Sequence, residues 1–82
     1  MKVFILTERF MNGTVTMSID AKAIAAETFQ GAKDILIDIL NKLTEGDVKI
    51  FENTDKGLKY NMYDGVVQGS LDNVELTFLN KE

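Results

Sequence analysis

The sequence has 82 residues, 45% of them hydrophobic and 27% charged, which is the size and composition of one small soluble globular domain spanning residues 1–82. The sequence has no cysteine, so disulfides are impossible and we expect a cytoplasmic protein. It has no histidine either, so a Ser-His-Asp triad is impossible, zinc and haem lose their usual ligands, and we expect no cofactor. The net charge is −4, the nine basic residues are spread along the chain, and no stretch approaches the about 20 apolar residues of a membrane span, so we expect neither nucleic acid nor membrane as a partner.

The strongest local signal is the dipeptide Asn12-Gly13, which lies between two runs of alternating residues. Asn-Gly tolerates the positive φ angles of a type I′ turn, so it predicts a β-hairpin with a two-residue loop. The second strand should end at about Lys22 or Ala23. The resulting register puts eight side chains on the face that packs into the core: Phe4, Leu6, Glu8, Phe10, Val15, Met17, Ile19 and Ala21. The other face is mostly polar and pairs Arg9 with Thr16, Thr7 with Ser18, Ile5 with Asp20, and Val3 with Lys22.

A helix is predicted over residues 28–45. Thr28 suits the N-cap position, and Gly46 suits the left-handed residue that follows a helix. Asp38 and Lys42 are four residues apart on the polar side and should form an ion pair. Apolar residues at helical spacing predict the buried stripe, which comprises Phe29, Ala32, Leu36, Ile39, Leu40 and Leu43 and is widened by Ile35 and Ile37.

The last third of the chain predicts strands. Residues 48–52 and 58–63 flank turn residues at 53–57, and strand alternation puts Tyr60 in the core and Tyr63 on the opposite face.

A second candidate for a type I′ turn follows at Asp64-Gly65. The extended chain continues over residues 66–68, Gly69-Ser70 indicates a bulge or bend, and residues 74–79 alternate again. These elements predict an α+β fold, with a mainly antiparallel sheet in ββαβββ order and one central helix packed on one face.

Three features of the chain are notable in combination: the opening strand Lys2-Val3-Phe4-Ile5-Leu6-Thr7, the central helix, and the aromatic-Asp-Gly turn Tyr63-Asp64-Gly65 before the final strand. In this combination the chain resembles a set of short uncharacterised α+β proteins from gut Bacteroidetes and their mobile elements. The resemblance spans most of the chain and implies the same order of elements. It implies no activity and no site residues.

Enzymatic chemistry has few groups to use in this sequence. Only carboxylates remain for acid–base catalysis, and the sequence places no two of them in an obvious cleft. The loop after Glu52 offers oxygen ligands, but Thr54, Lys56 and Tyr63 stand where a calcium loop needs acidic or amide residues. We therefore expect a polar hairpin loop and no enzyme, and we assign no catalytic, cofactor-binding or metal-binding residues.

Glu8 is the one residue that disagrees with the predicted hairpin, because it is charged and lies on the core face opposite Met17. A buried and unpaired carboxylate costs several kcal/mol. The favoured interpretation places Glu8 in water, beyond the part of the sheet that the helix covers. The alternative is a partly buried carboxylate that binds a ligand.

The sheet face away from the helix is the predicted interaction surface. Val3 and Ile5 are apolar residues on that mostly polar face, with Arg9, Thr16 and Tyr63 beside them. We expect a non-enzymatic module that binds protein through this face or through an edge strand and that is able to form a homodimer. The alternatives are a small acidic inhibitor from a mobile element, acting on a nucleic-acid-binding host protein, and, least favoured, an enzyme that uses carboxylates alone.

Overall fold

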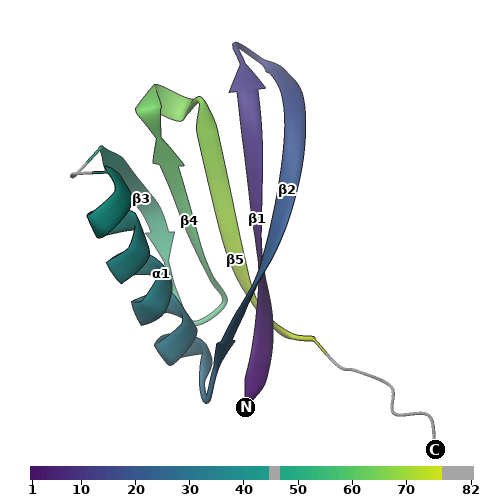
Figure 1. Ribbon diagram of the computed structural model, residues 1–82, viewed down its shortest axis with the longest axis vertical. Helices are drawn as coiled ribbons and strands as arrows, with labels where there is room; N and C mark the ends of the chain where they lie inside the picture. The colour runs from purple at the N-terminus through teal and green to yellow at the C-terminus, as the bar shows by residue number, and fades with distance from the viewer. Residues whose placement is uncertain (45–46, 77–82) are drawn as a thin grey trace, which may run out of the picture.

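Five antiparallel strands and one helix make up the fold, which a computed structural model describes for residues 1–44 and 47–76 (Figure 1). The elements follow in the order β1 (Lys2–Asn12), β2 (Val15–Ala26), α1 (Phe29–Thr44), β3 (Val48–Asn53), β4 (Gly57–Met62), the short 3₁₀ turn η1 (Tyr63–Gly65) and β5 (Val67–Glu75). This order confirms the predicted α+β class and the ββαβββ sequence of elements. Among the described residues, no helix is long and apolar enough to cross a membrane.

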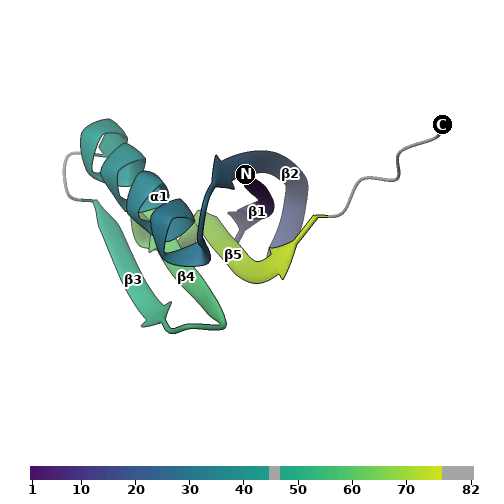
Figure 2. The same cartoon turned by 90° about the horizontal axis from the view of Figure 1, so that it is seen from below.

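Across the sheet the strands are ordered β2-β1-β5-β4-β3, so β5, which follows all the other described strands in the chain, lies at the centre. β5 pairs with β1 on one side and β4 on the other, and it thereby joins the N-terminal hairpin to the β3–β4 hairpin. The sheet is curled, and the β1–β2 hairpin bends toward the side on which α1 lies (Figure 2). β2 and β3 are the two edges.

The helix begins where the sequence predicts. The Gly31 N–H donates a hydrogen bond of 3.0 Å to Thr28 Oγ1, which confirms Thr28 as the N-cap. The centroid of the Phe29 ring lies 5.3 Å from the centroid of the Phe4 ring on β1. The predicted ion pair between Asp38 and Lys42 is present at 3.0 Å. The assignment of Gly46 lies outside the described residues.

The predicted helix stripe is only partly correct. Phe29, Ala32, Leu36 and Leu40 are buried, but Ile39 and Leu43 are 42% and 73% exposed. α1 is one helix on a five-stranded sheet, and the described residues leave Ile39 and Leu43 uncovered on the side of the helix that faces the hairpin.

The predicted hairpin register is wrong. Asn12 pairs with Val15, so Gly13 and Thr14 form the turn, with Gly13 at a positive φ of 62° in the first turn position. A glycine with positive φ at that position is what a type II′ turn requires, whereas the type I′ turn would need positive φ at Asn12. A bulge near Met17 shifts the pairing again, and the second strand continues to Ala26.

Beyond the bulge, the corrected register reverses the faces of β2. Phe4 now pairs with Ile24, Leu6 with Lys22 and Glu8 with Asp20, so from Ser18 onward the even-numbered residues of β2 share the face of the even-numbered residues of β1, which packs against α1. The residues expected in the core are instead exposed: Val15, Met17, Ile19 and Ala21. The predicted core face of β1 is correct over Phe4 and Leu6.

Two predictions about the later strands also need correction. The β4–β5 connection is a four-residue loop after Met62, in which Tyr63, Asp64 and Gly65 all have positive φ, and not a two-residue Asp64-Gly65 turn. β5 runs without a bend through Gly69, and its irregularity falls later, between its pairings with Leu6 and Phe4.

Candidate functional site

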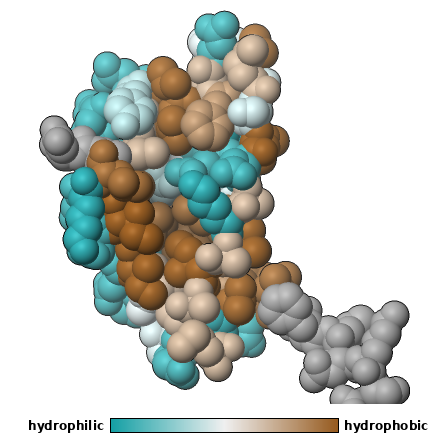
Figure 3. All heavy atoms as spheres, viewed as in Figure 1, coloured by the Kyte–Doolittle hydropathy of each residue, from teal (hydrophilic) through white to brown (hydrophobic). Residues whose placement is uncertain are grey.

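A groove runs between α1 and the β1–β2 hairpin on the helix-covered side of the sheet. Five strands spaced by about 4.8 Å are about 19 Å wide, whereas a helix is about 10 Å across, so one helix leaves part of this face uncovered. The groove has a volume of about 320 Å³. In Figure 3, apolar side chains follow the side of α1 that faces the hairpin, and a polar group lies across from them.

The helix wall of the groove is apolar. It consists of Leu36, Ile39, Leu40 and Leu43, which are spaced at three and four residues and therefore share one side of the helix. From Leu36 to Leu43 this wall is about 10 Å long, which equals about three residues of extended chain. Because Ile39 and Leu43 remain exposed, the wall offers apolar surface that this chain does not bury itself.

The opposite wall is the edge of the sheet. Lys22, Ala23 and Ile24 are consecutive residues of β2, and all three line the groove. Successive side chains of a strand point to opposite faces, so the groove must reach the strand's main chain. β2 has β1 as its one strand neighbour in the described part of the chain, and its outer N–H and C=O groups therefore lack a ladder partner.

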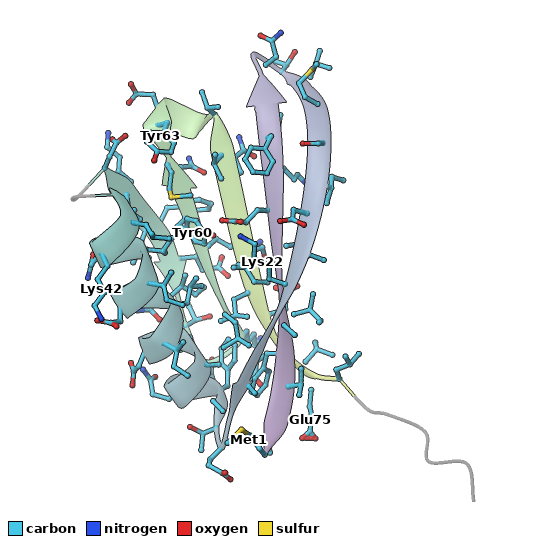
Figure 4. All side chains as sticks on the ribbon, in the orientation of Figure 1. Met1, Lys22, Lys42, Tyr60, Tyr63 and Glu75 are labelled. Carbon is cyan, nitrogen blue, oxygen red and sulfur yellow. The ribbon has the colours of Figure 1, made fainter. Side chains whose placement is uncertain are left out.

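The floor of the groove carries a hydrogen-bonded carboxylate. The Tyr60 hydroxyl on β4 donates a hydrogen bond of 2.6 Å to Glu8 Oε2 on β1, and Lys22 Nζ on β2 donates one of 3.3 Å to Glu8 Oε1. Figure 4 shows Lys22 and Tyr60 approaching the same region between α1 and the hairpin. Burial raises the pKa of the Tyr60 hydroxyl well above its usual value, and the hydrogen bond to Glu8 and its negative charge raise this pKa further.

Gly69 makes the Tyr60–Glu8 contact possible. It lies on β5 between the two strands and pairs with Glu8 on one side and Tyr60 on the other. A Cβ atom on Gly69 would overlap the ring carbons Cζ and Cε2 of Tyr60. The tyrosine ring thus lies across β5 in the space that this glycine leaves.

The structure corrects the favoured interpretation of Glu8. Its side chain is buried and paired, not solvated beyond the helix. Each carboxylate oxygen already accepts a hydrogen bond from within the chain, and no buried side-chain nitrogen or oxygen among the described residues lacks a partner. This arrangement is suited to binding and to holding three strands together.

The predicted interaction residues do not form one surface. Val3 and Ile5 are half-buried and Arg9 and Thr16 exposed, all on the face away from α1, as the corrected register requires. Tyr63 instead lines the groove, on the same side of the sheet as Tyr60, because the β4–β5 loop departs from strand alternation.

The β3–β4 loop forms the polar connection that the sequence predicts. The Thr54 N–H donates a hydrogen bond of 2.9 Å to the Gly57 carbonyl. Lys33 is a buried lysine of α1 that no pattern in the sequence singles out, and it donates to Asn53 Oδ1 at 3.0 Å and to the Thr54 carbonyl at 2.8 Å. Over residues 1–44 and 47–76, no group of three or more acidic side chains is placed to hold a metal ion.

Comparison with protein-family models, with curated proteins and with solved structures found no match for this chain.

Proposed function

We propose that this chain is a non-enzymatic interaction module that binds an extended segment of a partner protein in the groove between β2 and α1. The segment adds a strand to β2, so its main chain pairs with the free edge at Lys22, Ala23 and Ile24, while its apolar side chains pack on α1. The observation that carries this proposal is the meeting of an unpaired strand edge and the exposed apolar side chains of Ile39 and Leu43 in one groove.

The chemistry of the groove favours binding over catalysis. Glu8 is the one carboxylate that lines it, and both of its oxygens already accept hydrogen bonds from Lys22 and Tyr60. A general base needs a free position toward its substrate's proton. The rest of the lining is largely apolar, as in sites that hold a ligand mainly by burying its surface.

Selection from a displayed library of short linear peptides tests this function. We expect the enriched peptides to alternate apolar and polar residues and to lack proline, because an added strand needs its N–H groups. Methylating the main-chain nitrogens that face β2 should abolish binding, as measured by fluorescence anisotropy of the labelled peptide. Leu43→Glu should also abolish binding without unfolding the protein, since Leu43 is exposed.

Phe51→Glu is the matched control. Phe51 is a large exposed side chain in the hollow on the face away from α1, where Arg9 and Lys59 also lie. This variant should bind the selected peptides as the parent does. Peptides that bind Leu43→Glu as tightly as the parent, or that tolerate N-methylation at every position, would contradict the proposal.

The acidic-inhibitor alternative has no specific observation in its favour. The face away from α1 carries Arg9, Lys49 and Lys59 together with Glu52 and Asp72, so acidic and basic side chains are mixed there. A homodimer formed through β2 would use the same free edge as the proposed peptide. Light scattering at increasing protein concentration, with and without peptide, measures whether the edge of β2 is occupied by a second copy of the chain or by the peptide.

A further inference from the structure

At the groove, Lys22 lies between two carboxylates, one in the groove lining and one beside it. Lys22 Nζ lies 3.3 Å from Glu8 Oε1 and 3.9 Å from Asp20 Oδ2, so one ammonium group serves two carboxylates. Among the residues that line the groove, Glu8 and Lys22 carry charge, and Asp20 lies beside them on the same face of the sheet, paired with Glu8. Within the cluster of Glu8, Asp20 and Lys22, therefore, one positive charge is missing.

The Asp20 carboxylate has unused capacity to accept hydrogen bonds. An ionised carboxylate offers about four lone-pair sites. Glu8 accepts one hydrogen bond at each oxygen, and Asp20 is within ion-pair distance of Lys22 alone among the described residues. The Asp20 side chain is 53% exposed, so a group that enters the groove can reach it.

The register of an added strand defines which side chains of the partner meet this charge. On the face toward α1, β2 presents Asp20, Lys22 and Ile24 in alternating positions. A strand paired with β2 places its own alternating side chains opposite these three. One partner side chain then lies beside Asp20 and Glu8, and another, four residues away, lies beside Ile24 and the helix wall.

We infer that the bound segment carries a lysine or arginine opposite Asp20 and an apolar residue opposite Ile24, so that its cation completes the network of Glu8, Asp20 and Lys22. This inference depends on the proposed function, because it names the kind of peptide that the same groove selects. The net charge of −4 on the whole chain favours the approach of such a basic segment. Opposite charges that face each other across two strands stabilise the pairing and fix its register.

The test uses a selected peptide and two variants of it, in which the basic residue is replaced by glutamine or by norleucine. Removing a charge-assisted contact in a partly buried site should weaken binding about tenfold. Asp20→Asn should weaken the binding of the basic peptide and reduce the difference between the basic and glutamine forms. Raised salt should reduce the same difference, because Asp20 is exposed enough to be screened.

Asp55→Asn is the control for the protein. It removes the same charge from an exposed residue in the β3–β4 loop, outside the groove, and it should leave affinity and charge preference unchanged. Glu8 is not substituted in this test, because its loss would remove the hydrogen bond partner of the buried Tyr60.

The outcomes separate this inference from the proposed function. If the selected peptides bind the parent but not Leu43→Glu, and they contain no basic residue or show no effect of Asp20→Asn, the inference is wrong and the proposed function stands. If no peptide is enriched, or if Leu43→Glu has no effect, both fail. Self-association that Leu43→Glu abolishes, with no peptide selected, would assign the groove to a second copy of the chain and overturn both.

Discussion

Gly69 on β5 lies between Glu8 and Tyr60, and its missing side chain is the space in which the Tyr60 ring lies. Gly69→Ala should therefore displace the ring and break its hydrogen bond to Glu8. Overpacking together with a buried carboxylate oxygen left unpaired should lower the free energy of unfolding by about 2 kcal/mol or more, measured by urea denaturation.

Gly31→Ala makes the same substitution in α1 and should have the opposite effect. A Cβ atom on Gly31 meets its nearest neighbour, Thr28 Oγ1, at 3.4 Å, and alanine stabilises a helix interior by up to about 1 kcal/mol relative to glycine. If Gly69→Ala were as stable as the parent, the Tyr60 ring would not lie across β5.

At the residue scale the sequence identifies Glu8 as exceptional, but it does not predict which residues Glu8 contacts. Strand alternation in β1 is a local pattern, and it correctly places Glu8 on the core face. Its partners are Lys22, 14 residues away, and Tyr60, 52 residues away, and no local pattern connects residues so distant. The useful signal for Gly69 is a glycine inside a strand, which indicates close approach by another group as well as a bulge.

At the scale of elements, β2 shows why alternation does not identify the buried face. Val15, Met17, Ile19 and Ala21 alternate as a half-buried strand should, but all four are exposed, and the bulge near Met17 turns Ile19 and Ala21 to the face away from α1. A shift by an odd number of residues exchanges the two faces of a strand. The type of each element was thus predictable from local pattern, while the buried face of β2 depended on one bulge.

Two isoleucines of β2 distinguish the two registers by experiment. Ile19 is 61% exposed and Ile24 is 8% exposed. Ile19→Thr should change the free energy of unfolding by no more than about 0.5 kcal/mol, as for other exposed positions. Ile24→Thr should cost about 1–3 kcal/mol, because it puts a hydroxyl into the core and removes apolar contact.

Threonine keeps the β-branched shape in both variants, so strand propensity is matched and burial is the difference between them. The register in which Ile19 faces Leu6 predicts the reverse order. Urea denaturation of the two variants and the parent therefore decides between the registers.

At the scale of the whole molecule, the central position of β5 is the feature that the sequence did not predict. Local patterns predict the order of elements along the chain. The pairing of β1 with β5, however, joins segments about 60 residues apart in sequence, and the propensities of individual residues do not determine such a non-local contact. The site depends on the same arrangement, because Tyr60 reaches Glu8 across β5. The groove could not be predicted, since it results from one helix on a wide, curled sheet.

The Tyr60–Glu8 contact makes the stability of the whole fold sensitive to alkali. The pKa of Tyr60 is raised above its ordinary value of 10.0, chiefly by burial, so the folded state holds this proton more tightly than the unfolded state does. The resulting contribution to stability is complete below pH 10.0 and is lost as the pH rises past it. The parent should therefore lose more stability between about pH 8 and about pH 11 than Tyr60→Phe does, measured by urea denaturation at both values.

A Tyr63→Phe variant leaves Tyr60 as the one tyrosine in the chain, so its ultraviolet absorbance reports this hydroxyl alone. We expect tyrosinate absorbance to appear only together with the loss of circular dichroism, because Tyr60 must leave the core before it ionises. Ionisation near pH 10.0 with the circular dichroism unchanged would show that the hydroxyl is accessible to water in the folded protein, which would contradict the buried contact across β5 on which the description of the groove floor depends.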